Sequence, residues 1–271
     1  MDCHRHLDHL RHPGFNRFDY PDPSHPIDLI VDNPFLSLII PAYNEEKRLP
    51  STLNQVVRFL EKQSYSHEIV IVDNASTDGT GKIIDDYARE HAGLRKLYEG
   101  QPGKGAAIRK GMLSAAGQYR FMCDADLSMP IGELNRFLPP RLEHFDLAIA
   151  SREAEGSIRY HEPIYRHLGG RLINFFIQLT LLPGMQDTQC GFKCFRGPVA
   201  EDIFKHLTLH GWAFDIEILT ISKMRGYRIK EVPIPWYFDS ESKVNAFQDA
   251  LGMLTDILTI RRNKRRGVYE K

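Results

Sequence analysis

The sequence predicts an α/β domain with a mostly parallel sheet, and two observations carry that prediction. Short apolar segments alternate along the chain with segments whose apolar residues recur at helical spacing. Acidic and polar clusters directly follow three of the apolar segments, which is where ligands bind in parallel α/β sheets. Such alternation implies βαβ units, because neighbouring parallel strands need a crossover connection.

The elements follow in chain order from their apolar cores. We expect strands at residues 36–40, 68–72, 94–98, 119–123 and 146–150, of which 94–98 carries the weakest pattern. Helical spacing predicts helices at 49–62 and 80–91. Two later segments, 166–182 and 244–260, carry apolar residues on one helical face and are expected to be amphipathic helices.

Composition divides the chain into three parts. Residues 1–34 are rich in His, Asp, Pro and Arg without any period, and we expect a flexible leader there, since the His and Cys spacing matches no established metal site. Residues 35–240 form the predicted catalytic domain. Residues 241–271 combine an amphipathic helix with a basic tail, in which five Arg and Lys residues lie within 261–266.

Bulk properties narrow the class of protein. Lys plus Arg and Asp plus Glu each total 35, so the net charge gives no argument for a nucleic-acid partner. No stretch reaches the ~18 uninterrupted apolar residues of a spanning helix, and the N-terminus lacks the apolar run of a signal peptide. Four unevenly spaced cysteines fit a reducing compartment. We therefore expect a cytoplasmic protein.

The strongest candidate site is Asp124-Ala125-Asp126, directly after the strand expected at 119–123. Two carboxylates one residue apart, beyond a buried strand, can share a hard divalent cation with diphosphate oxygens. The cation would neutralise a nucleoside diphosphate as it leaves. The pattern predicts a Mg2+ or Mn2+ site at Asp124 and Asp126, although by itself it also fits a solvated turn.

Upstream loops supply further groups for a nucleotide. The first strand leads into 41–46 (PAYNEE) and the second into 73–80 (DNASTDGT), where carboxylates such as Glu45 or Asp73 can accept hydrogen bonds from a base or ribose. Asp78 fits a helix N-cap better than a ligand contact. Lys104, between two glycines at a helix start, is expected to touch donor phosphate, or else marks a plain turn.

These motifs resemble a known family. Residues 36–126 look like the GT-A (Rossmann-like) domain of family 2 glycosyltransferases. Later segments resemble dolichyl-phosphate β-glucosyltransferases and their prokaryotic polyprenyl-phosphate relatives, namely DTQCGFK at 187–193, WAFDIE at 212–217 and SKV at 242–244. The similarity spans roughly residues 36–262. It implies inverting transfer of a hexose, first of all glucose from UDP-glucose, to a polyprenyl or dolichyl phosphate.

The resemblance also implies roles for individual residues. One departure is Asn74, where family members often carry a second Asp, which leaves Asp73 to make the charged contacts. Arginine suits phosphate through its planar fork of donors, although Arg166 also fits a surface arginine. The nucleotide pocket would be lined by Pro41, Tyr43, Glu45 and Asp73, and the acceptor phosphate would be held by Arg152, Arg166 and Lys193.

Asp187 and Asp215 raise the question of a catalytic base. Transfer to a sugar hydroxyl needs a carboxylate that accepts the proton, whereas a phosphate acceptor is already an anion. We therefore expect both residues to shape the site. Asp215 is the first candidate base if the acceptor is a hydroxyl, and Asp187 fits a buried structural acid equally well.

A lipid acceptor places the protein at a membrane. The amphipathic helices and the basic tail would dock on the cytoplasmic face of an anionic bilayer, or would instead pack on the sheet, in a homodimer or against a membrane-protein partner. Three alternatives stay open: a GDP-mannose-dependent polyprenyl-phosphate mannosyltransferase, a transferase to a soluble hydroxyl acceptor, and a nucleotide-sugar-binding partner subunit without turnover.

Overall fold

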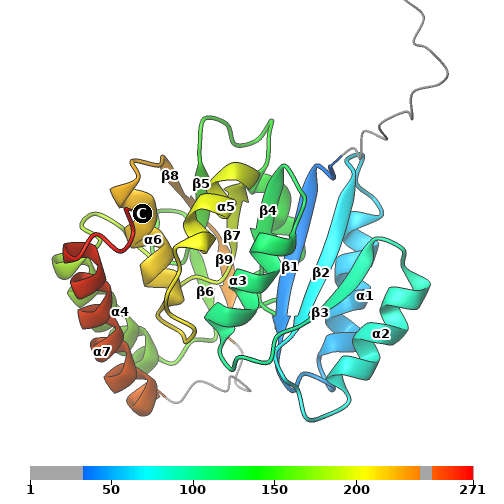
Figure 1. Cartoon of the computed structure of the whole chain (residues 1–271), viewed down its shortest axis with the longest axis horizontal. Helices are drawn as coiled ribbons and strands as arrows, with labels where there is room; N and C mark the ends of the chain where they lie inside the picture. The colour runs from blue at the N-terminus through cyan, green and yellow to red at the C-terminus, as the bar shows by residue number, and fades with distance from the viewer. Residues whose placement is uncertain (1–32, 239–245, 271) are drawn as a thin grey trace, which may run out of the picture. The chain divides into compact units, whose positions relative to one another are not determined.

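The structure is a computed structural model that describes residues 33–238 and 246–270 (Figure 1). The leader expected at 1–34 lies outside these ranges except for its last two residues, and the SKV segment at 242–244 also lies outside them. The boundaries expected for the catalytic domain and the C-terminal part therefore stay predictions.

A seven-stranded sheet forms the centre of the described chain, in the order β3-β2-β1-β4-β7-β5-β8. Hydrogen bonding makes every neighbouring pair parallel except those of β7, which runs antiparallel to β4 and to β5. The two short strands β6 (Ile158–Tyr160) and β9 (Pro235–Tyr237) pair separately. The bounds of the sheet strands are β1 Leu36–Ala42, β2 His67–Asp73, β3 Leu94–Tyr98, β4 Tyr119–Met122, β5 Leu147–Ser151, β7 Lys193–Arg196 and β8 Ile229–Pro233.

Helices cover both faces of the sheet because its strands are apolar on both sides. Alternate residues of β1 belong to different cores: Leu38 and Ile40 pack with α1, α2 and η1, while Ile39 packs with α3, α5 and α6. Figure 1 shows the two layers on either side of the strands. The helices are α1 Leu49–Leu60, α2 Thr80–Glu90, α3 Lys104–Ser114, the 3₁₀ helix η1 Ile131–Phe137, α4 Ile164–Thr180, α5 Gly197–Lys205, α6 Phe214–Met224 and α7 Ala246–Arg265.

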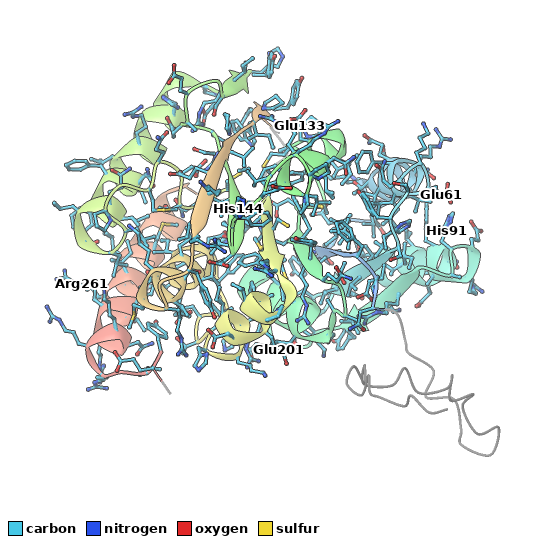
Figure 2. The ribbon with its side chains drawn as sticks, turned by 90° about the horizontal axis from the view of Figure 1, so that it is seen from above. Glu61, His91, Glu133, His144, Glu201 and Arg261 are labelled. Atoms are coloured by element: carbon cyan, nitrogen blue, oxygen red, sulfur yellow. The ribbon has the colours of Figure 1, made fainter. Side chains whose placement is uncertain are left out.

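The helices α1 and α2 lie side by side on their face of the sheet. Figure 2 shows Glu61, just after α1, near His91, just after α2, and their side chains are 3.8 Å apart. Tyr87 of α2 donates its hydroxyl hydrogen bond to the Pro50 carbonyl of α1 at 3.1 Å. These contacts hold the two helices against each other.

The predicted fold class is confirmed, and the expected strands and helices are present with shifted ends. The last helix differs most: α7 continues through Arg265, although we expected it to stop before the basic residues. Arginine and lysine favour helices, and cations near the C-terminus interact favourably with the helix dipole. Strands β7 and β8 and the small β6–β9 pair were not predicted, and neither were η1, α5 and α6.

The point where strand order reverses lies between β1 and β4. From β1 the chain proceeds to β2 and β3 on one side and then returns to β4 on the other. The carboxyl ends of β1 and β4 are therefore neighbours with loops that diverge, which opens a crevice for a ligand in folds of this kind. Residues 43–48 and 123–128 occupy that edge. No helix in the described ranges is long and apolar enough to cross a membrane.

Candidate active site

Asp124 and Asp126 lie in the turn that follows β4. The backbone of this turn is anchored from α1, since the Thr52 hydroxyl donates to the Ala125 carbonyl at 2.5 Å. The Ser128 amide donates to Asp126 Oδ1 at 2.9 Å. The two carboxylates are thus held at the reversal point of the sheet and stay partly exposed.

A glycine makes room for the Asp124 carboxylate. A Cβ atom on Gly191 would lie 2.3 Å from Asp124 Oδ2 and 2.8 Å from Oδ1, so no side chain fits there while Asp124 keeps its position. Gly191 immediately precedes Phe192 and β7, the antiparallel strand beside β4. The segment before β7 therefore forms one wall of the acidic turn.

Lys104 supplies a cation to the same turn. Its Nζ lies 2.5 Å from Asp124 Oδ1 and 5.3 Å from the ring centroid of Trp212. Burial alone would lower the pKa of Lys104, but the nearby carboxylates of Asp124 and Asp215 outweigh burial and raise it. Lys104 is also the first residue of α3, where the helix dipole is positive.

The electrostatics of the acidic turn fit a divalent cation. Burial raises the pKa of Asp126, and the charge of Asp124 raises it further. Two carboxylates this close leave negative charge that Lys104 alone does not balance. Within the described part of the chain no third His, Cys, Asp or Glu joins them, and Mg2+ is usually held by one or two carboxylates together with substrate phosphates and water.

The two upstream loops are locked to each other at the ends of β1 and β2. Buried Asp73 accepts a hydrogen bond from the Ser76 amide at 3.0 Å, and the Ser76 hydroxyl accepts one from the Asn44 amide at 3.1 Å. The Thr80 hydroxyl accepts from the Glu45 amide at 2.7 Å. The expected nucleotide residues Pro41, Tyr43, Glu45 and Asp73 thus share one edge, with the Tyr43 side chain 51% exposed.

Asn74 shows why an amide occupies this position. Its Nδ2 donates to the carbonyls of Glu99 and Gln101 at 3.1 and 2.7 Å, and its Oδ1 accepts from the Gly103 amide at 3.0 Å. A carboxylate cannot donate to the two carbonyls. Asn74 therefore ties the loop before Lys104 to the end of β2, a role that was not predicted.

Asp78 takes the structural role expected of it. Its carboxylate accepts hydrogen bonds from the Thr80 amide at 3.0 Å and from the Glu46 amide at 3.2 Å. The first of these caps the start of α2, and the second joins the two loops.

On the far side of β4, Arg152 and Asp187 form a closed pair. Arg152 follows β5, and its Nε and Nη2 donate to the two Asp187 oxygens at 2.7 and 2.9 Å. Backbone amides of Arg152 and Gln189 also donate to Asp187, at 3.0 and 3.2 Å. Burial alone would raise the pKa of Asp187, but Arg152 and these amides lower it to about 2. The guanidinium lies 5.5 Å from the Trp236 ring centroid.

Lys193, which we expected to hold the acceptor phosphate, lies buried beside Asp215. Its side chain is fully buried, and its Nζ donates to the Cys190 carbonyl and pairs with Asp215. Strand pairing turns this residue of β7 into the core, where Asp215 compensates its charge. Burial raises the pKa of Asp215, although Lys193 and Lys104 oppose the shift. Arg166 lies on α4, and its side chain is outside the described residues.

Sequence reasoning missed three residues of this edge. Thr52 anchors the acidic turn, Gly191 makes room for Asp124, and Trp212 lies under Lys104. Gly191 and Trp212 lie inside the segments that carry the family resemblance, and that was the available signal. Thr52 lies in an ordinary amphipathic helix and gave none.

A mostly parallel sheet with an acidic pair at its reversal point is the arrangement of a GT-A-like fold. The sequence profile of glycosyl transferase family 2 matches residues 37–204. The dolichyl-phosphate beta-glucosyltransferase of Dictyostelium discoideum is 34% identical over 255 residues, covering 89% of this chain and 78% of that protein. The one of Homo sapiens is 31% identical over 242 residues, covering 83% and 74%. The chain belongs to glycosyl transferase family 2.

Solved structures share the fold at low sequence identity. Mannosyl-3-phosphoglycerate synthase from Rubrobacter xylanophilus superposes with a TM-score of 0.63 at 20% identity, over 86% of this chain and 75% of that one. Glucosyl-3-phosphoglycerate synthase from Mycobacterium tuberculosis, in complex with Mn2+, UDP-glucose and phosphoglyceric acid, gives 0.59 at 16% identity, over 84% and 79%.

Proposed function

We propose that the protein transfers glucose from UDP-glucose to a polyprenyl or dolichyl phosphate, with inversion at the anomeric carbon. The observation that carries the proposal is the Asp124–Asp126 pair beside Lys104, at the reversal point of the sheet. The names of the curated relatives supply the sugar and the lipid class. The Mn2+ and UDP-glucose bound by a protein of the same fold support the donor.

On the donor side, the nucleotide would lie along the ends of β1 and β2. Glu45 and Asp73 are carboxylates that can accept hydrogen bonds from base or ribose hydroxyls. Asp124 and Asp126 would hold Mg2+ or Mn2+, which neutralises the departing UDP. Lys104 and the first amides of α3 would contribute positive charge beside the diphosphate.

On the acceptor side, no base is needed if the nucleophile is a phosphate. Its oxygen is already anionic at neutral pH and can attack the sugar carbon directly. Asp187 is unsuited to accept a proton, because its low pKa and its bonds to Arg152 keep it ionised and engaged. Arg152, held in place by Asp187, and Arg166 of α4 would neutralise the acceptor phosphate. We assign Lys193 the different role of compensating buried Asp215.

The acceptor would reach the site from a membrane surface formed by α4 and α7. Figure 1 shows these helices side by side, and the Gln189 side chain before β7 donates to Met253 Sδ of α7 at 3.2 Å. Large apolar side chains on this surface face solvent. Those on α4 are Leu172, Phe175, Phe176 and Leu179, exposed by 71%, 60%, 47% and 72%, and those on α7 are Leu254 and Leu258, exposed by 46% and 63%.

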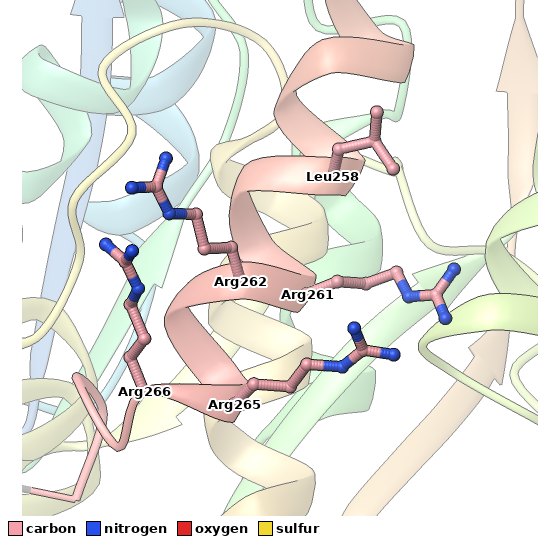
Figure 3. Close-up of a pocket in the computed structure, with 5 residues that line it drawn as sticks. All are labelled: Leu258, Arg261, Arg262, Arg265 and Arg266. Atoms are coloured by element: carbon pink, nitrogen blue, oxygen red, sulfur yellow. The ribbon is translucent and has the colours of Figure 1, made fainter.

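Four arginines continue the surface along α7. In Figure 3, Arg261 and Arg265 extend to one side of the helix and Arg262 and Arg266 to the other, with Leu258 above them. Each cation near an anionic bilayer contributes about 1 kcal/mol of attraction. An apolar helix face beside a basic cluster is the composition of a helix that lies in a membrane interface. This surface supports a peripheral location at the cytoplasmic face of a membrane.

Transfer of labelled sugar to a short polyprenyl phosphate tests the proposal. UDP-glucose and GDP-mannose are offered separately, each with Mn2+ or with EDTA. We expect glucosyl lipid that depends on the metal. Label from GDP-mannose alone would overturn the sugar. Donor hydrolysis without lipid product would favour a soluble hydroxyl acceptor, with Asp215 as base. Nucleotide binding without turnover on any acceptor would favour a partner subunit.

Co-sedimentation with vesicles tests the membrane surface. Replacing Arg261, Arg262, Arg265 and Arg266 by Gln should weaken binding to phosphatidylserine-containing vesicles at least tenfold, from about 1 kcal/mol per cation. The matched control replaces four exposed cations of the α1–α2 layer, Arg58, Lys62, Lys82 and Arg89, by Gln. Equal binding by the two variants would show that the α7 surface is not the one that docks.

A further inference from the structure

A second carboxylate on α6 has no part in the reaction proposed above. Asp215 and Glu217 both lie in the first turn of α6, and Glu217 is fully buried. Its Oε2 accepts hydrogen bonds from the amides of Thr208 and Leu209 at 3.1 and 2.8 Å. Its Oε1 accepts from the Thr208 hydroxyl at 2.5 Å and from the Tyr269 hydroxyl at 2.7 Å. Four donors therefore fix one carboxylate.

Tyr269 brings the C-terminal segment to this carboxylate. It follows α7, and its side chain is 1% exposed within the same core as α3 and α6. Burial raises the pKa of Tyr269, and the charge of Glu217 raises it further, so the hydroxyl remains a donor. Asn263 of α7 adds a hydrogen bond to Thr208 Oγ1 at 3.1 Å. The end of the described chain is thus bonded to Glu217 and to Thr208.

The segment 208–212 connects Glu217 to the start of α3, where Lys104 contacts the acidic turn. The His210 carbonyl accepts from the Ala106 amide at 3.2 Å, in the first turn of α3. A Cβ on Gly103 would lie 2.2 Å from the His210 carbonyl oxygen, and one on Gly105 would lie 2.8 Å from that of Leu209. The two backbones therefore pack without space between them. Lys104 lies between these glycines, next to Trp212 and Asp124.

We propose that Glu217 and Tyr269 are positioning residues, which fix the segment 208–212 and thereby hold Lys104 at the Asp124 carboxylate. The C-terminal segment then sets the geometry of the metal and diphosphate site without touching either ligand. Only the catalytic readout below rests on the function proposed above.

Hydrogen exchange of the backbone tests the link without substrate. In Tyr269→Phe, amides of 208–212 and of 103–107 should exchange about tenfold faster than in the wild type, while those of α5 keep their rates. The matched control is Tyr227→Phe, which removes a hydroxyl that lies just after α6 and donates to Asp202 of α5 at 2.7 Å. Unchanged exchange at 103–107 in Tyr269→Phe would overturn the proposal.

Thr208→Val provides a second variant of nearly equal size. It removes the hydroxyl that bonds Glu217 and Asn263 and leaves Tyr269 in place. It should raise exchange in the same two segments, which separates the effect from any general loosening of the C-terminus. If Thr208→Val affected only the segment 208–212, the connection to Lys104 would be refuted.

Turnover supplies a readout that a purely structural role would not change. In Tyr269→Phe, the KM for UDP-glucose should rise about tenfold, because Lys104 would contribute positive charge beside the diphosphate, and the KM for the lipid acceptor should be unchanged. A uniform fall of kcat at an unaltered KM for UDP-glucose would contradict positioning of Lys104. If the wild type made no glucosyl lipid, the proposed function would fail while the exchange experiment still decided the link.

Discussion

Two ion pairs lie at the same edge of the sheet, Asp187 with Arg152 and Asp124 with Lys104. They differ in how completely the protein satisfies the carboxylate. Asp187 is 4% exposed and accepts both prongs of Arg152 together with two backbone amides. Asp124 has a 25% exposed side chain, a single lysine contact and a second carboxylate two residues away. Both acids are shielded from solvent to some degree, but only the charge of Asp187 is balanced by protein groups.

The difference favours a structural role for Asp187, which holds Arg152 for the proposed acceptor phosphate, and a ligand-binding role for Asp124 and Asp126. A buried carboxylate with every lone pair satisfied holds its neighbours in place and has nothing left to offer. A carboxylate that shares its surroundings with another acid keeps unbalanced charge, which a divalent cation and a diphosphate can complete. The same residue types at one edge therefore serve opposite purposes.

The largest effect on the reaction rate is expected from removing one carboxylate of the Asp124–Asp126 pair. Asp126→Ala should lower kcat/KM by ~1000-fold, because it removes a proposed metal ligand at the point where charge would develop. Stability should not fall, since burial and Asp124 already raise the pKa of Asp126. Steady-state rates and urea unfolding measure the two quantities. Asp85→Ala, which removes an exposed partner of Lys96, is the control and should keep its activity.

A single methyl group at Gly191 should give the next largest loss of activity. The new Cβ would displace the Asp124 carboxylate, and misplacement of a catalytic group by about 1 Å can cost ~100-fold in rate. Gly191→Ala should therefore lose activity with its fold retained, as circular dichroism and single-turnover rates would show. Gly132→Ala is the control, because nothing lies within 4 Å of its Cβ. Full activity of Gly191→Ala would disprove the close contact.

Breaking the closed pair should act on stability. Asp187→Asn leaves Arg152, whose side chain is 23% exposed, without its counter-charge. Loss of one partner of a buried pair costs about 3–5 kcal/mol, and the partial exposure of Arg152 places the expected loss at the lower end of that range. Urea unfolding at neutral pH measures the change. The exposed pair of Glu201 and Lys205, on α5, provides the comparison: Glu201→Gln should cost much less, because solvent screens an exposed ion pair. Equal losses in the two variants would mean that Asp187 contributes no more than a surface acid.

The smallest effect is the acid sensitivity of the same pair. The pKa of Asp187 is about 2 in the fold, against about 3.9 when unfolded. The resulting stability is fully present above pH ~4 and disappears as the pH falls toward ~2, and it amounts to about 2–3 kcal/mol. Unfolding free energies between pH 5 and pH 2 should fall less steeply in Asp187→Asn than in the wild type. Parallel pH profiles would show that the pairing does not lower this pKa.

The loops proposed to bind the donor could be predicted from the sequence, and the reason is physical. Parallel strands all end at one edge, so the loops at 41–46, 73–80 and 124–126 had to meet once the strands were identified. The β1–β4 half of the sheet contains only such strands, with Lys104 at the start of the next crossover helix. Local patterns were sufficient there.

The acceptor half depends on contacts between distant segments, which no local pattern reveals. Lys193 was expected at the acceptor, but it lies on an antiparallel strand whose pairing with β4 and β5 turns it inward to Asp215. The bidentate pairing of Arg152 with Asp187 and the hydrogen bond from the Tyr269 hydroxyl to Glu217 likewise join segments far apart in sequence. The residue type shows that a side chain is charged or polar, but it does not show which distant residue it will contact.

The position of β7 between β4 and β5 has a consequence for the newly made chain. Both neighbours leave the ribosome well before β7, so each presents an open edge of unpaired amides and carbonyls during synthesis. Pairing that joins such distant segments forms slowly and exposes apolar surface in the meantime. The donor loops can assemble on a nascent chain, whereas the wall beside Asp124 closes only when β7 arrives. Chaperone dependence should therefore concentrate in the interval between β4 and β7.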